Sequence, residues 1–220
     1  MPTKIKICGI TNQPDAGLAA DLGADLLGFN FYPPSPRYLE PDRAAQIIAA
    51  LPARRPEIVG LFVNAAPAHI AAVLQSCPLT MLQLHGDESP DLCRTLAALG
   101  LPLIKALRMR SPADLDRARD YDTPYILLDA FHPDLYGGTG DTFDWSWIAS
   151  LPDKKILLAG GITPANVQQA LAVRPYALDL CSGVEAAPGR KDPQKLRDLF
   201  AHLRTENTDH NNQSNPDTRL

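Results

Sequence analysis

The feature that most constrains the fold of this chain is an eightfold alternation of a short apolar run, a polar or glycine-containing loop, and a stretch with helical periodicity. Short apolar runs that alternate with helices predict parallel strands joined by crossover helices. Their near-continuous apolar character is typical of strands covered on both faces. We predict strands at Ile5–Cys8, Leu26–Phe31, Ile58–Val63, Met81–Leu84, Leu103–Leu107, Tyr125–Leu128, Lys155–Ala159 and Ala177–Cys181.

Eight strand–helix units in 220 residues predict an α/β protein with a single (β/α)8 barrel, the TIM barrel, near the small end of its size range. A doubly wound open sheet is the alternative, but it usually has about five or six strands and a GxGxxG motif after the first. Here the first strand ends in Cys8-Gly9-Ile10-Thr11. We assign residues 1–203 to the barrel and expect the polar stretch 204–220 to be a disordered tail, because it cannot bury enough apolar area.

Three Ser/Thr-Pro pairs predict helix starts. Ser89-Pro90, Ser111-Pro112 and Thr163-Pro164 each place a side-chain oxygen at the N-cap and a proline at the first helical position, where no amide hydrogen is needed. Gly100 is expected to end the first of these helices, since glycine accepts the left-handed conformation found there.

Charge and composition exclude several classes of partner. The net charge of −4 and the lack of a concentrated Lys/Arg block argue against nucleic acid. No apolar run approaches the ~18–20 residues of a membrane span, and the start MPTKIKICG is read as a strand rather than a signal peptide. The four cysteines, Cys8, Cys77, Cys93 and Cys181, lack CxxC spacing, so we expect free thiols and a cytoplasmic protein.

Polar residues at strand ends mark the candidate site, because barrel enzymes carry their catalytic groups at the carboxyl ends of the strands. We expect an acid and a base on opposite sides of this mouth, and such an arrangement allows proton transfer to and from one substrate. The strand-end residues are Cys8, Asn30, Asn64, His85, Arg108, Asp129, Gly160-Gly161 and Ser182-Gly183, with Asp179 just inside the eighth strand.

Glycine-containing loops after strands six, seven and eight predict a phosphate site. Backbone amides without side chains can approach an anion closely, and barrels often bind phosphate after strands seven and eight. A lone loop of this kind could be a simple turn, but three consecutive loops favour an anion. The candidate residues are Gly138, Gly140, Gly160, Gly161, Ser182 and Gly183.

Cys8 and Asp129 are the candidate proton-transfer pair. Cys8 could be only a small buried residue, and Asp129 only a loop-capping carboxylate. As a base, Cys8 needs a lowered pKa, and as an acid, Asp129 needs a raised one. Arg37 lies in a loop stiffened by three prolines, where its guanidinium could hold a carboxylate. His85 is a candidate for substrate binding, and without a second strand-end histidine we expect no metal.

The ordered set of motifs resembles the phosphoribosylanthranilate isomerases over about residues 4–200. Any one block is modest evidence, whereas the ordered set is highly specific. The blocks are Lys6-Ile7-Cys8-Gly9-Ile10-Thr11, Gly28-Phe29 with Ser35-Pro36-Arg37-Tyr38, Gly60-Leu61-Phe62-Val63-Asn64, Leu82-Gln83-Leu84-His85-Gly86, Leu128-Asp129 with Gly137-Gly138-Thr139-Gly140, Leu158-Ala159-Gly160-Gly161-Ile162, and Asp179 with Ser182-Gly183-Val184-Glu185.

The resemblance implies a cofactor-free isomerase of tryptophan biosynthesis that performs an Amadori rearrangement of N-(5-phosphoribosyl)anthranilate. By resemblance, Asp129 is the general acid at the furanose oxygen and Cys8 is the base at C2. Arg37 is then near the anthranilate carboxylate and Asp179 near the sugar, with phosphate on the glycine loops. Cys181 departs from the pattern, in which a smaller or hydroxyl residue is expected.

Two other functions remain open at this point. The related aminosugar isomerase of histidine biosynthesis uses an aspartate where Cys8 stands and must hold a second phosphate. A barrel that only binds a phosphorylated metabolite would need neither Cys8 nor Asp129. We expect a small-molecule substrate and either a monomer or a homodimer.

Overall fold

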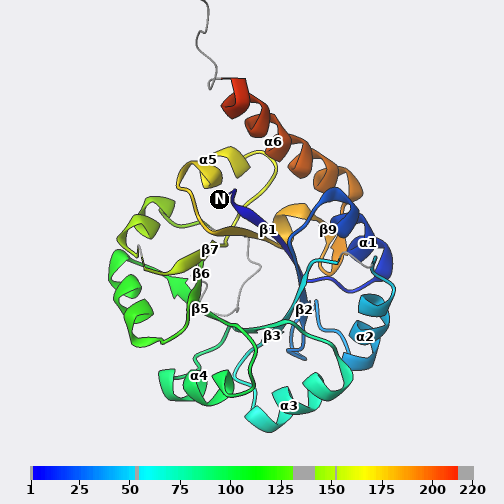
Figure 1. The fold of residues 1–220 in the computed structure, drawn as a ribbon, viewed down its shortest axis with the longest axis vertical. Helices are drawn as coiled ribbons and strands as arrows, with labels where there is room; N and C mark the ends of the chain where they lie inside the picture. Colours follow the sequence, from blue (N-terminus) through cyan, green and yellow to red (C-terminus); the bar gives the residue numbers. More distant parts are fainter. Residues whose placement is uncertain (1, 53–54, 131–141, 152, 213–220) are drawn as a thin grey trace, which may run out of the picture.

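The computed structural model describes residues 2–52, 55–130, 142–151 and 153–212, and it confirms the predicted barrel. Eight parallel strands are hydrogen-bonded in sequence order, and the circle closes where β1 pairs with β8 (Figure 1). All eight predicted runs coincide with a strand. The strands are β1 Lys4–Cys8, β2 Leu26–Asn30, β3 Glu57–Phe62, β4 Met81–Leu84, β5 Leu103–Met109, β6 Tyr125–Ala130, β7 Lys155–Leu158 and β8 Ala177–Leu180.

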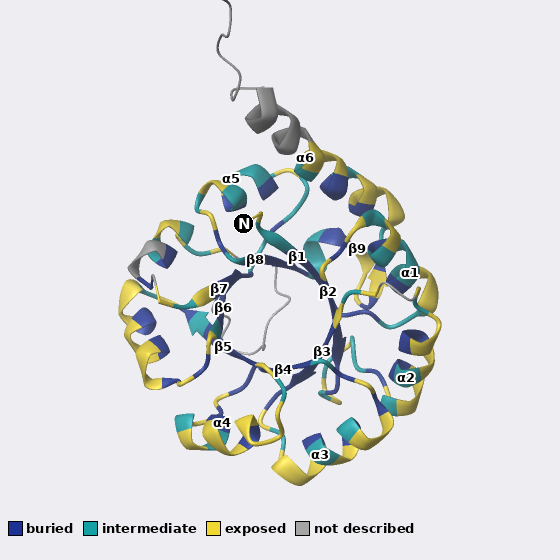
Figure 2. Ribbon diagram, viewed as in Figure 1, coloured by how far each residue is buried: buried dark blue, intermediate teal, exposed yellow. Residues whose placement is uncertain are grey.

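A ring of helices surrounds the barrel. The outward faces of the helices are exposed, while the strands are buried (Figure 2). Short 3-10 helices replace the α-helices after β5 and β6. Within the described residues, no helix is both long and apolar enough to cross a bilayer. The helices are α1 Gln13–Leu22, α2 Pro41–Ala49, α3 Pro67–Ser76, α4 Pro90–Ala97, η1 Pro112–Asp120, η2 Trp145–Ser150, α5 Val167–Ala172, η3 Ser182–Val184 and α6 Pro193–Asn212.

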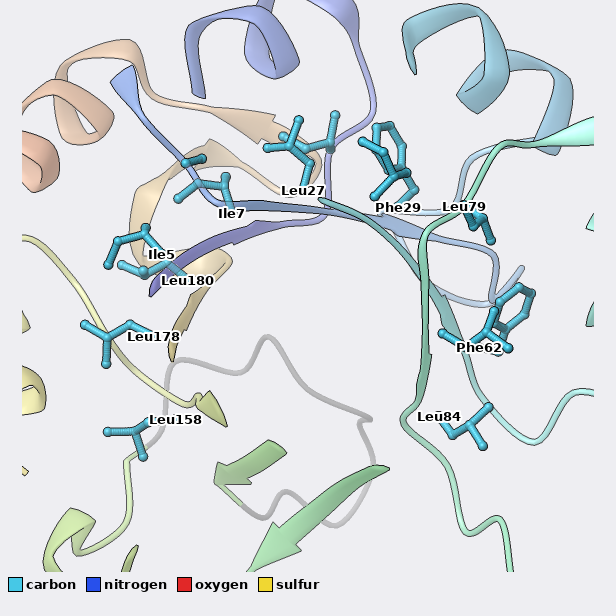
Figure 3. Close-up of a cluster of buried hydrophobic side chains, with 14 of the residues drawn as sticks. Ile5, Ile7, Leu27, Phe29, Phe62, Leu79, Leu84, Leu158, Leu178 and Leu180 are labelled. Atoms are coloured by element: carbon cyan, nitrogen blue, oxygen red, sulfur yellow. The ribbon is translucent and has the colours of Figure 1, made fainter. Parts of the chain in front are cut away.

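Side chains alternate between the two faces of the barrel wall. Ile5 and Ile7 belong to the large apolar core between strands and helices, which also contains Leu178 and Leu180 (Figure 3). The intervening positions face the barrel interior, because successive side chains of a strand point to opposite faces. A smaller apolar cluster, which includes Val59 from β3, fills the interior below the mouth. Polar interior positions therefore collect at the carboxyl ends of the strands.

The predicted helix starts are partly confirmed. Ser89 caps α4 by accepting a hydrogen bond from the Leu92 amide, and Gly100 has the expected left-handed conformation just beyond the helix. Ser111 begins a helix as predicted, but that helix, η1, is of the 3-10 type.

The prediction that Thr163 caps a helix is wrong. Helix α5 starts only at Val167, with Asn166 in the capping position. The Asn166 side chain instead accepts a hydrogen bond from the Thr163 amide and donates one to the Gly161 carbonyl. Residues 163–166 are therefore folded as a turn against the loop that leaves β7.

The chain after β8 returns to the mouth before it forms the last helix. Strands β9 Glu185–Ala187 and β10 Arg190–Lys191 make a two-stranded antiparallel hairpin. Helix α6 then packs beside α1 and α5. It continues through residues 204–212, which the sequence assigned to the tail, because no proline or glycine interrupts the chain there. Residues 213–220 lie outside the described part.

Candidate active site

A cavity of about 380 Å³ opens at the carboxyl ends of the barrel strands. It brings together residues that are far apart in the sequence, as expected for a barrel mouth. Asn64 and Arg108 do not line it: Asn64 accepts a hydrogen bond from the Asp87 amide, and Arg108 forms an ion pair with Asp87. The predicted residues that line it are Cys8, Asn30, Arg37, His85, Asp129, Gly160, Gly161, Asp179, Ser182 and Gly183.

A buried ion pair joins Lys6 of β1 to Asp179 of β8, and Asp179 lines the cavity. Lys6 Nζ donates to both carboxylate oxygens of Asp179 at 2.9 Å, and the lysine is completely buried. Although burial lowers it, the pKa of Lys6 is raised overall by the Asp179 carboxylate. Burial raises the pKa of Asp179 to about 7 against the opposing effect of Lys6. The charges of Cys8 and Asp129 raise the pKa of Asp179 further, and all three side chains line the same cavity.

Cys8 and Cys181, which both line the cavity, form a pair of thiols. A hydrogen bond from Cys181, together with the positive charge of Lys6, holds the pKa of Cys8 well below its usual range despite burial. The same hydrogen bond raises the pKa of Cys181 well above the usual range. Two adjacent thiols that share one proton separate their titrations in this way. The pair therefore favours the thiolate on Cys8 rather than on Cys181.

The hairpin after β8 supplies a second cation to the thiol pair. Lys191 is buried, and its Nζ lies 3.9 Å from Cys181 Sγ and 2.9 Å from a carboxylate oxygen of Glu185. Its charge lowers the pKa of Cys8 further. We refer to Lys6, Cys8, Asp179, Cys181 and Lys191 as the base side of the cavity.

Asp129 lies in a different environment. Its Oδ2 is 3.2 Å from His85 Nε2, and its Oδ1 accepts a hydrogen bond from the Ala130 amide. His85 Nδ1 is in turn 2.8 Å from the Gln83 side-chain nitrogen. The other end of that amide, Gln83 Oε1, is buried without a hydrogen-bond partner among the described residues. We refer to Gln83, His85 and Asp129 as the acid side.

Arg37 reaches the cavity, but a carboxylate of the protein already holds part of its guanidinium. Arg37 Nη2 donates to Glu185 Oε2 at 2.7 Å, and Nε donates to Oε1 at 3.0 Å. Burial raises the pKa of Glu185, but Arg37 and Lys191 lower it overall, so the carboxylate stays charged. Gly9 leaves room for this arrangement, because a Cβ there would come within 2.8 Å of Arg37 Cδ.

The loops after β7 and β8 meet at the cavity rim. A Cβ on Gly183 would lie only 1.9 Å from the Ile162 carbonyl oxygen, so only glycine permits this approach. Gly160 and Gly161 both have positive φ angles, which also favour glycine. The two loops therefore present backbone rather than side chains to one part of the cavity. Gly138 and Gly140, the remaining phosphate-site candidates, lie outside the described residues.

Four residues of the site received no role from the sequence: Lys6, Gln83, Glu185 and Lys191. A lysine two positions before Cys8 on an apolar strand was a usable signal, because residues i and i+2 share a face. Gln83 has the same relation to His85. Nothing in the sequence connects Lys191 to Cys181, since the hairpin creates that contact. Across the described ranges, no group of three or more His, Cys, Asp or Glu side chains could hold a metal ion.

Comparison with known proteins identifies the family. The N-(5'-phosphoribosyl)anthranilate isomerase family matches residues 5–202. The chain belongs to this family. A phosphoribosylanthranilate isomerase from Acidithiobacillus ferrooxidans is 52% identical over 208 residues, which cover 91% of this chain and 97% of that protein. The resemblance predicted from the motifs is confirmed.

Crystal structures of phosphoribosylanthranilate isomerases have the same fold. The Thermus thermophilus isomerase has 40% identity and a TM-score of 0.86, with 93% of this chain and 100% of that chain covered. Another isomerase of the family, also 40% identical, superposes with a TM-score of 0.81 over 92% of this chain and 99% of its own. That structure is a complex with reduced 1-(o-carboxyphenylamino)-1-deoxyribulose 5-phosphate.

Proposed function

We propose that this chain converts N-(5'-phosphoribosyl)anthranilate to 1-(2-carboxyphenylamino)-1-deoxyribulose 5-phosphate in tryptophan biosynthesis, with Cys8 as the base and Asp129 as the acid. One observation carries the residue assignment: a thiol with a lowered pKa and a carboxyl group face the same cavity from β1 and β6. The free state of all four cysteines supports a reducing, cytoplasmic setting.

The first step opens the ribose ring. Asp129 donates its proton to the furanose oxygen, and the bond between that oxygen and C1 breaks as the anthranilate nitrogen forms a double bond to C1. The product is a protonated Schiff base, and Asp129 is left as a carboxylate. General acid catalysis of this kind contributes about 10²–10⁴-fold to rate.

The second step moves a proton from carbon. The Cys8 thiolate removes the proton at C2, and the electron pair moves toward the iminium nitrogen to give an enolamine. This species becomes the ketone when its C2 hydroxyl loses a proton and C1 gains one. Lys6 and Lys191 support the step because nearby cations maintain the thiolate before the reaction begins.

The acid side can support both protonation states of Asp129. When the Gln83 nitrogen donates to His85 Nδ1, the imidazole proton is on Nε2 and stabilises the carboxylate. When the amide is reversed, Gln83 Oε1 accepts from Nδ1–H, and Nε2 can accept the proton of a neutral Asp129. The unpartnered Oε1 is thus the atom needed for the state before ring opening.

The remaining groups are placed to bind the two ends of the substrate. We assign the phosphate to the backbone of Gly160, Gly161, Ser182 and Gly183, where side chains cannot block an anion. We assign the anthranilate carboxylate to the face of Arg37 that lines the cavity. Asp179 lines the same cavity as Cys8 and Asp129 and would contact the sugar hydroxyls.

The test is the decay of phosphoribosylanthranilate fluorescence after addition of purified protein. Wild-type protein should accelerate the decay, whereas Asp129→Asn and Cys8→Ala should each reduce kcat by ~10²–10⁴-fold. Circular dichroism and binding of the reduced product analogue serve as controls for folding and site integrity. A near-normal kcat in either variant refutes the role assigned to that residue, and no acceleration by the wild type refutes the function.

A further inference from the structure

Cys8 and Cys181 are positioned to form a covalent bond. The last paired residues of β1 and β8 are Ile7 and Leu180, so the two cysteines are the next residues along neighbouring strands. Neighbouring strands lie ~4.8 Å apart, within the ~4.4–6.8 Å between Cα atoms that a disulfide spans. Both side chains line the cavity, and the Cys181 sulfur lies against Gly9, the residue next to Cys8, where a Cβ would come within 3.0 Å of it.

The environment of this pair favours reaction with an oxidant. Cys181, Lys6 and Lys191 lower the pKa of Cys8, and the thiolate is the reactive form of cysteine. The cavity gives a small oxidant access to both sulfur atoms. Cys77 and Cys93 differ in each respect, because burial raises the pKa of both thiols to about 11 and neither lines the cavity.

We propose that hydrogen peroxide oxidises Cys8 and Cys181 to a reversible disulfide, and that this bond switches the isomerase off. The loss of activity rests on the proposed function, in which Cys8 is the base. The disulfide itself does not depend on that function.

The chemistry proceeds in two balanced steps. The Cys8 thiolate attacks one oxygen of the peroxide, the O–O bond breaks, and Cys8 becomes a sulfenic acid as hydroxide leaves. Cys181 then attacks the Cys8 sulfur, an S–S bond forms, and water leaves with the Cys181 proton. The two cysteines lose two electrons, which reduce the peroxide to water. A dithiol such as dithiothreitol returns those electrons by thiol–disulfide exchange.

The pairing also determines what happens to Cys8 after oxidation. A sulfenic acid without a nearby thiol is oxidised further to sulfinic acid, which dithiothreitol does not reduce. A disulfide with Cys181 stops this second oxidation. The residue at position 181 therefore decides whether peroxide inactivation is reversible.

The experiment treats the purified full-length protein with hydrogen peroxide and maps the products by mass spectrometry. We expect the tryptic peptides 7–37 and 156–190 to be linked and the number of free thiols to fall from four to two. Dithiothreitol should reverse the link and restore activity. Wild-type protein with four free thiols after treatment, or with a link that uses Cys77 or Cys93, would overturn the proposal.

Two variants separate the disulfide from simple loss of Cys8. Cys181→Ser keeps a hydroxyl donor for Cys8, and after the same treatment it should recover at least ~10-fold less of its own initial activity than wild type. Cys77→Ala is the matched control and should recover like wild type. Equal recovery by Cys181→Ser and wild type would contradict the protective role. A wild-type protein that forms the link but never isomerises the substrate would refute the switch and the proposed function together, while the disulfide would stand.

Discussion

The base side and the acid side of the cavity are built from different kinds of residue. The base side holds Cys8 between two buried lysines, Lys6 and Lys191, and one of these is paired with Asp179. The acid side holds Asp129 against His85 and the Ala130 amide, and among the described residues no lysine or arginine forms an ion pair with it. The two halves of one mouth thus differ in their buried lysines, which both lie on the base side.

This difference matches what each group must do before the reaction starts. A base must begin deprotonated, and nearby cations favour a thiolate. An acid must begin protonated, and a nearby cation would favour the carboxylate and take that proton away. The comparison teaches that the barrel places Lys6 and Lys191 beside the group that must begin deprotonated and away from the group that must donate a proton.

The largest expected effect is on the rate at which Cys8 is alkylated, because that rate depends on how far its thiol is ionised. At pH 7 a thiol whose pKa is about 11, as in Cys77 and Cys93, is ionised in only ~1 molecule in 10⁴. Cys8 should therefore react with iodoacetamide at least ~10³-fold faster than either of them, as measured by peptide mass spectrometry. Because the pKa of Cys8 is lowered, its alkylation rate should fall less than the rates of Cys77 and Cys93 when the pH is reduced from ~9 to ~7.

The acid side provides the control for this measurement. Asp129→Asn should change the alkylation rate of Cys8 little, since Cys181 and the lysines, rather than Asp129, lower the pKa of Cys8. If Cys8 reacts no faster than Cys77, the cationic description of the base side is wrong.

The second expected effect is on stability. Lys6→Met removes the cation that compensates the buried Asp179 carboxylate, and breaking such a pair costs about 3–5 kcal/mol of unfolding free energy. The folded state of the variant should bind a proton on Asp179 more strongly than the unfolded state does. Because the pKa of Asp179 is already about 7 in the wild type, the loss of stability relative to the wild type should grow as pH rises through and above 7, as measured by urea unfolding.

The double variant Lys6→Met/Asp179→Asn identifies the cause of that loss. It removes both charges and should recover at least half of the lost free energy with a flatter pH dependence. Equal losses in the single and double variants would show that packing, rather than an uncompensated charge, stabilises this part of the barrel.

The smallest expected effect concerns the acid side. Gln83→Leu leaves His85 Nδ1 without its partner and should lower kcat by ~10-fold, with little change in KM, because the imidazole is no longer held in one protonation pattern. Gln83→Glu is the matched variant, since its carboxylate accepts from Nδ1–H and so keeps Nε2 free to accept a proton. It should have a higher kcat than Gln83→Leu, and the reverse order would rule out the tautomer argument.

Many residues that line the cavity could be predicted from the sequence, because each of them is marked by a local signal, its position at the end of an apolar run. Cys8, Asp129 and Gly160-Gly161 were found by reading the residue that follows each apolar run. The cap at Thr163 failed for the same reason: a local Ser/Thr-Pro pattern cannot report that Asn166 folds back onto the loop after β7.

The sequence by itself determined the eight strands, their order and the set of polar residues at their ends, because strand and helix periodicities are short-range properties of the chain. Only the tertiary structure decided which of those residues touch. Lys6 and Asp179 are 173 positions apart, and Cys8 meets Cys181 only because β8 closes the barrel against β1. The charge state of the site depends on those contacts, since burial and neighbouring charges at a few ångströms set each pKa.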